Sequence, residues 1–142
     1  MKVTIFRSAM DTAVDRHCTF ADVYREMMSM PNEVSGLSGK EYDEAKRRLK
    51  CFCVGKFRDR LPGAQPEELE QVLVFDLDHI DSPEDFCKEH LQWAWIAFPS
   101  PSERGIRLIL KATFSTLEER ELLYFQVARK LSANTGLRLE EE

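Results

Sequence analysis

Residues 72–79 read Val-Leu-Val-Phe-Asp-Leu-Asp-His, an apolar run that ends in two carboxylates, Asp76 and Asp78. Such a run predicts a buried strand. Because side chains alternate across a strand, the two carboxylates project from the same face and can hold the same cation. Hard divalent cations prefer oxygen ligands, so the pair predicts a Mg²⁺ or Mn²⁺ site and phosphate chemistry. An acid after an apolar run also commonly ends a strand or caps a helix, and the motif alone does not decide between these interpretations.

The segments around this strand predict a single α/β or α+β domain over residues 1–142, with helices flanking a mixed central sheet. Ser82-Pro83 begins a helix, and Thr116 with Glu119 forms a capping box that opens another. The expected strands are 2–7, 51–54, 72–78, 93–98, 106–112 and 137–140, and the expected helices are 20–30, 39–49, 82–91 and 116–135. Residues 8–18 are expected to form a loop, and Trp93 and Trp95 to lie in the core on one face of their strand.

The composition is that of a soluble globular protein, with 43% hydrophobic and 32% charged residues and a net charge of −5. That charge argues against a general nucleic-acid coat. Residues 40–60 nevertheless carry eight basic against four acidic side chains. This surplus predicts either a surface that follows a phosphate backbone or a solvated helix face. The candidate nucleic-acid contacts are Lys46, Arg47, Arg48, Lys56 and Arg58.

The first residues carry no signal-peptide pattern, and no segment approaches the length of a membrane span. We therefore expect a cytoplasmic protein without a membrane partner. The cysteines Cys18, Cys51, Cys53 and Cys87 lack zinc-ribbon spacing, so reduced structural thiols are expected.

The segment 99–107 carries a second candidate constellation. Its hydroxyls, guanidinium groups and accessible backbone amides predict a cradle for a triphosphate, in which Arg107 makes bidentate phosphate contacts. An ordinary Pro-Ser turn remains the alternative. The candidate nucleotide-binding residues are Ser100, Ser102, Arg104, Gly105 and Arg107.

Three segments in order, at 46–57, 74–79 and 98–108, resemble the VirE N-terminal family of the archaeo-eukaryotic primase superfamily. They read Lys-Arg-Arg-Leu-Lys-Cys-Phe-Cys-Val-Gly-Lys-Phe, Val-Phe-Asp-Leu-Asp-His and Phe-Pro-Ser-Pro-Ser-Glu-Arg-Gly-Ile-Arg-Leu. The resemblance covers the chain from about residue 38 to its end. It implies a primase-like (RRM-like) catalytic core that makes or extends nucleic-acid strands.

On this resemblance, Asp76 and Asp78 are the metal carboxylates and Arg107 binds the triphosphate, where many members have a histidine. Glu103 replaces a glycine of the family pattern. The third acidic motif falls on Glu140, so either Glu140 completes the metal site or the module is truncated at its C-terminus.

The resemblance therefore implies a primase/polymerase-like nucleotidyltransferase of DNA replication or of mobile-element or phage nucleic-acid metabolism. Its implied partners are a nucleoside triphosphate, a single-stranded DNA or RNA template and a replication helicase. A non-catalytic module that binds nucleotide, nucleic acid or a protein partner is the alternative, supported by the short C-terminus and Glu103. A metal-dependent nuclease ranks third, because no catalytic Lys or His motif accompanies the acids.

Overall fold

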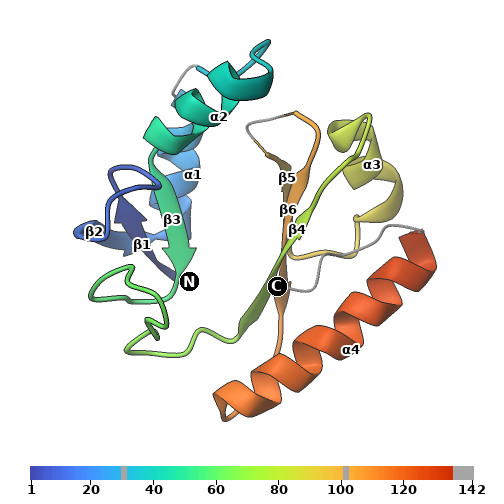
Figure 1. Ribbon diagram of the computed structural model, residues 1–142. Helices are drawn as coiled ribbons and strands as arrows, with labels where there is room; N and C mark the ends of the chain where they lie inside the picture. The colour runs from blue at the N-terminus through green and yellow to red at the C-terminus, as the bar shows by residue number, and fades with distance from the viewer. Residues whose placement is uncertain (30–31, 101–102, 136–142) are drawn as a thin grey trace. The chain divides into compact units, whose positions relative to one another are not determined.

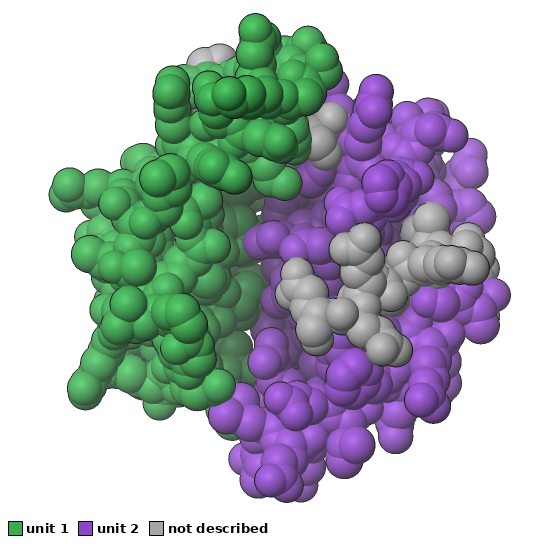
Figure 2. Space-filling view, viewed as in Figure 1, with its two compact units in different colours: residues 1–70 green, residues 71–142 purple. Residues whose placement is uncertain are grey.

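The computed structural model describes residues 1–29, 32–100 and 103–135 (Figure 1). These residues form a mixed α+β structure with four helices and two three-stranded antiparallel sheets. The chain divides into two compact units, residues 1–70 and residues 71–142, coloured green and purple in Figure 2. No described helix combines the length and the apolar character that a membrane crossing requires.

Unit 1 is built on β1 (Lys2–Phe6), the central strand of its sheet. The edge strands β2 (Val14–Thr19) and β3 (Cys51–Val54) pair with it in antiparallel register. Helices α1 (Phe20–Ser29) and α2 (Gly39–Arg48) complete the unit. Burial of alternate β1 side chains against α1 forms a small core of Val3, Ile5 and Val23.

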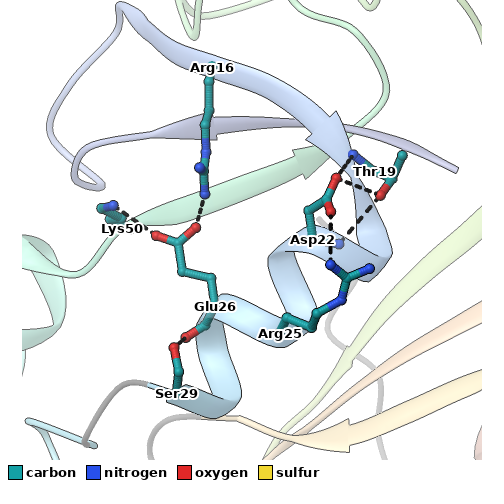
Figure 3. Close-up of polar contacts among 7 residues, drawn as sticks. All are labelled: Arg16, Thr19, Asp22, Arg25, Glu26, Ser29 and Lys50. Carbon is teal, nitrogen blue, oxygen red and sulfur yellow. Dashed lines mark hydrogen bonds and ion pairs between the residues drawn. The ribbon is translucent and has the colours of Figure 1, made fainter.

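Two groups of polar contacts fix α1 to its surroundings (Figure 3). At the start of α1, the Thr19 hydroxyl donates to Asp22 at 2.8 Å, and the Asp22 backbone N–H donates back to that hydroxyl at 3.4 Å. Further along the helix, the Glu26 carboxylate pairs with Arg16 of β2 and, at 2.9 Å, with Lys50. One acidic side chain of α1 therefore joins the helix to β2 and to the residue that precedes β3.

Unit 2 is built on β4 (Val72–Leu77), β5 (Ile96–Pro99) and β6 (Ile106–Lys111), with β6 between the other two. Helix α3 (Pro83–His90) connects β4 to β5, and α4 (Leu117–Thr135) follows β6. One face of the sheet is apolar, because Phe75 and Leu77 of β4 lie opposite Leu108 and Ile106 of β6 and all four are buried. The Tyr124 ring of α4 stacks on Phe75 with 4.5 Å between centroids, so α4 covers this face (Figure 1).

The expected α+β class is confirmed, but the expected mixed central sheet is not found among the described residues. In unit 2, β6 lies between β4 and β5 and runs antiparallel to both, so these two strands never pair with each other. A mixed sheet would need a parallel pair, which requires two strands joined by a crossover to be direct neighbours. The expected strand 137–140 lies outside the described residues.

Two local predictions were wrong. Residues 14–19 form β2 rather than a loop, because pairing with β1 at the edge of the sheet stabilises a strand without a buried apolar face. Trp93 and Trp95 are 61% and 44% exposed rather than core, because β5 begins only at Ile96 and the preceding residues form a turn.

Candidate functional site

The two sequence-predicted carboxylates lie where β4 ends. Phe75 and Leu77 are 1% and 2% exposed, whereas Asp76 and Asp78 are both exposed. The apolar residues of β4 face the core under α4, so strand alternation places Asp76 on the opposite side of the sheet. The side chains of Asp76 and Asp78 are therefore accessible to a ligand.

Arg107 of β6 lies directly opposite Asp76 in the sheet register. Its Nε donates to Asp76 Oδ1 at 2.8 Å and its Nη2 donates to Asp76 Oδ2 at 3.0 Å. This bidentate fork is the strong form of an arginine–carboxylate pair. The sequence assigns Asp76 to a cation and Arg107 to a phosphate, and the structure pairs these two residues with each other.

Asp78 adjoins the loop between β5 and β6 at Gly105. A Cβ atom at position 105 would lie 2.9 Å from the Leu77 carbonyl oxygen, 2.9 Å from Ser100 Oγ and 3.1 Å from Asp78 Oδ1. A methyl group would collide with the Leu77 carbonyl oxygen, which belongs to the backbone, and would press on the two side-chain oxygens, so the position favours glycine. The carboxylate of Asp78 and the hydroxyl of Ser100 therefore both lie beside Gly105.

Backbone hydrogen bonds hold this end of the sheet together. The Ser100 N–H donates to the Gly105 carbonyl at 2.8 Å, and the Ile80 N–H donates to the Arg104 carbonyl at 2.8 Å. The second bond joins the turn after Asp78 to the β5–β6 loop. Sequence reasoning missed the backbone hydrogen bond of Ile80. The only sequence signal for it is that Ile80, two positions after Asp78, is apolar.

The described oxygen donors are of the kind that Mg²⁺ and Mn²⁺ bind, namely two carboxylates and a hydroxyl. Within residues 1–29, 32–100 and 103–135, no group of three or more His, Cys, Asp or Glu side chains is arranged to hold a metal ion. Glu140, the predicted third carboxylate, and Ser102, a predicted phosphate ligand, lie outside the described residues. Of the three predicted metal carboxylates, the structure therefore describes Asp76 and Asp78.

The five candidate nucleic-acid contacts belong to unit 1 and fall into two groups. Lys46, Arg47 and Arg48 form the last turn of α2 and are exposed, where positive charge also favours the helix dipole. Lys56 and Arg58 both pair with Glu67, at 3.4 and 2.5 Å. The hydrogen bond from Arg58 holds the pKa of Glu67 below its ordinary value, so the Glu67 carboxylate is ionised. It therefore competes with any phosphate group for the side chains of Lys56 and Arg58.

Comparison of the chain with known protein families, curated proteins and solved structures finds no match. The resemblance to the primase superfamily therefore rests on the quoted motifs.

Proposed function

We propose that unit 2 binds a divalent cation and a nucleoside triphosphate at this end of its sheet and acts as a primase/polymerase-like nucleotidyltransferase. The observation that supports the proposal is the convergence of two sequence motifs. Asp76 lies opposite Arg107, and Asp78 lies against Gly105. Residues predicted to bind a cation and residues predicted to bind a phosphate, about 30 positions apart in the chain, thus lie close together.

The topology of unit 2 is compatible with the proposed primase-like, RRM-like core. Its elements follow the order β4-α3-β5-β6-α4, with β6 between β4 and β5. These are the first five elements of the β-α-β-β-α-β ferredoxin-like arrangement. Such a fold hosts many functions, so the topology supports the scaffold and the residues support the chemistry.

In this proposal Mg²⁺ or Mn²⁺ is held by Asp76 and Asp78, with Glu140 as the third carboxylate. A divalent cation at such a site neutralises phosphate charge and activates a hydroxyl nucleophile. The guanidinium of Arg107 binds the triphosphate, aided by Ser100, Ser102, Arg104 and the Gly105 amide. Glu103 adds a negative charge to the same loop, which opposes triphosphate binding.

Unit 1 supplies the basic side chains proposed to contact a single-stranded DNA or RNA template. Arg47 and Arg48 are exposed at the end of α2 and form no ion pair with another described residue. A cytoplasmic role in DNA replication or mobile-element metabolism, beside a replication helicase, completes the proposal.

The test is incorporation of labelled dNTP or NTP into a primed single-stranded template with Mn²⁺. Asp76→Asn and Asp78→Asn are each expected to abolish incorporation, because either change removes a cation ligand. Glu121→Gln, which neutralises an exposed acid on α4, is expected to retain it. Incorporation by both Asp variants at the wild-type rate would exclude this site as the catalytic one.

A non-catalytic nucleotide-binding module is the second candidate, and the Asp76–Arg107 pair favours it. A carboxylate already neutralised by arginine is a weaker cation ligand than a free one. Binding of a non-hydrolysable dNTP by the wild type, without incorporation under any metal condition, would select this function over the first.

A further inference from the structure

We infer that Arg107 closes the cation site by holding Asp76 and opens it when a phosphate group takes over the guanidinium, so that phosphate and divalent cation bind cooperatively. This inference rests on the proposed function and adds a mode of regulation to the same site. It follows from the contacts of Arg107, Asp76 and Asp78.

The Asp76–Arg107 pair disfavours a cation at Asp76 for two reasons. Both carboxylate oxygens accept a guanidinium N–H, so binding a metal through them means giving up hydrogen bonds at 2.8 and 3.0 Å. The guanidinium also repels any cation that approaches the carboxylate. Within the described part of the chain, Asp78 makes no ion pair, so it is the carboxylate that is ready for a cation.

A phosphate group can compete for Arg107 because its geometry matches the guanidinium fork as well as a carboxylate does. The pair is within reach of such a ligand, since the side chains of Arg107 and Asp76 are 31% and 57% exposed. Partly exposed ion pairs contribute little net stability, which makes the exchange of partners inexpensive.

Cooperativity follows from the shared pair. A cation that binds alone must separate Asp76 from Arg107, and a phosphate that binds alone must do the same. When both ligands bind, the free energy of separating Asp76 from Arg107 is needed only once. By thermodynamic linkage, each ligand then raises the affinity for the other by the same factor.

The first experiment titrates Mn²⁺ alone into the whole chain. Arg107→Lys keeps the charge but loses the fork, Arg107→Gln loses both, and Lys111→Gln removes a positive charge at the far end of the same strand, opposite Val72. We expect Arg107→Lys to bind Mn²⁺ about fivefold more tightly than the wild type, and Arg107→Gln more tightly still. Lys111→Gln is expected to match the wild type.

Equal Mn²⁺ affinity of the wild type and Arg107→Lys would overturn the inference while leaving the cation site in place, because Arg107 would then act through its charge alone. Absence of Mn²⁺ binding by every variant, in chains whose circular dichroism is that of the folded wild type, would overturn both the inference and the proposed cation site.

The second experiment measures inorganic triphosphate binding in the presence of a metal chelator. Asp76→Asn and Asp78→Asn remove the same charge from the same site, but only the first removes the carboxylate that accepts the two hydrogen bonds from Arg107. We expect Asp76→Asn to bind triphosphate about fivefold more tightly than Asp78→Asn does. Equal affinities of the two variants would overturn the inference and leave a site governed by net charge.

Discussion

His79 and Glu103 adopt the same left-handed backbone conformation, with φ of 59° and 58°, on the two segments that meet at the end of the unit 2 sheet. No other non-glycine residue in the described part of the chain has positive φ. The conformation is unfavourable for a residue with a Cβ. Strained residues of this kind concentrate at functional sites, which is an independent reason to look for function at this end of the sheet.

Two substitutions of Glu103 distinguish the effect of its backbone strain from the effect of its negative charge. Glu103→Gly removes both, whereas Glu103→Ala removes the charge and keeps a Cβ at φ 58°. We expect the glycine variant to be about 1 kcal/mol more stable than the alanine variant in denaturant unfolding. Both variants are expected to bind nucleoside triphosphate more tightly than the wild type. A glycine variant less stable than the alanine variant would contradict the left-handed assignment.

Loss of the Phe75 ring should destabilise unit 2. Phe75 is 1% exposed and stacks on Tyr124, so Phe75→Ala is expected to lower the free energy of unfolding by about 3–5 kcal/mol. Both tryptophans of the chain, Trp93 and Trp95, belong to unit 2, so their fluorescence during urea unfolding reports on this unit. Leu122→Ala, at a position that is 65% exposed, is the control and should change little.

The buried hydroxyl of Thr4 should hold the segment after β3 in place. It donates to the Gly55 carbonyl at 2.8 Å and accepts from the Phe57 N–H at 2.9 Å. Thr4→Val leaves both backbone groups without this partner, so we expect a loss of about 2 kcal/mol in unfolding free energy. Hydrogen exchange at the Phe57 amide should accelerate in the same variant. Thr4→Ser keeps the hydroxyl, and it should keep the slow exchange.

The Asp22 carboxylate should contribute a pH-dependent part of the stability of unit 1. The hydrogen bond from the Thr19 hydroxyl, and then that from the Thr19 backbone, hold the pKa of Asp22 below its ordinary value. A lowered pKa in the folded state means that the stabilisation is complete above the ordinary pKa and disappears as the pH falls through the folded-state pKa.

Unfolding free energies of the wild type and Asp22→Asn, followed by circular dichroism, test this sign. The wild type should be the more stable at about pH 7, and its advantage should shrink as the pH falls below the ordinary pKa of an aspartate and through the lowered pKa of Asp22. A difference that grew on acidification would show that the carboxylate is not stabilised by these bonds.

Local sequence signals were sufficient where neighbouring residues determine the structure. The first bond of the predicted capping box forms, with the Glu119 N–H donating to the Thr116 hydroxyl at 3.1 Å, whereas the Glu119 carboxylate accepts from the Ser115 N–H at 2.6 Å instead of from Thr116. The apolar run that ends at Leu77 is a buried strand, as predicted, with Leu73, Phe75 and Leu77 in the core. In contrast, β2 and the exposure of Trp93 and Trp95 were missed, because each depends on a partner strand or a turn rather than on its own residues.

The sequence by itself determined the α+β class, the buried strand before Asp78 and the oxygen-rich chemistry of the candidate site, because hydrophobic period and residue type act locally. Only the tertiary structure decided that β6 lies between β4 and β5. In that arrangement the strand register places Asp76 opposite Arg107. From the sequence, Asp76 was predicted to bind a cation and Arg107 a phosphate group. Register depends on which strands pair and on which faces are buried, and both follow from contacts between residues far apart in the chain.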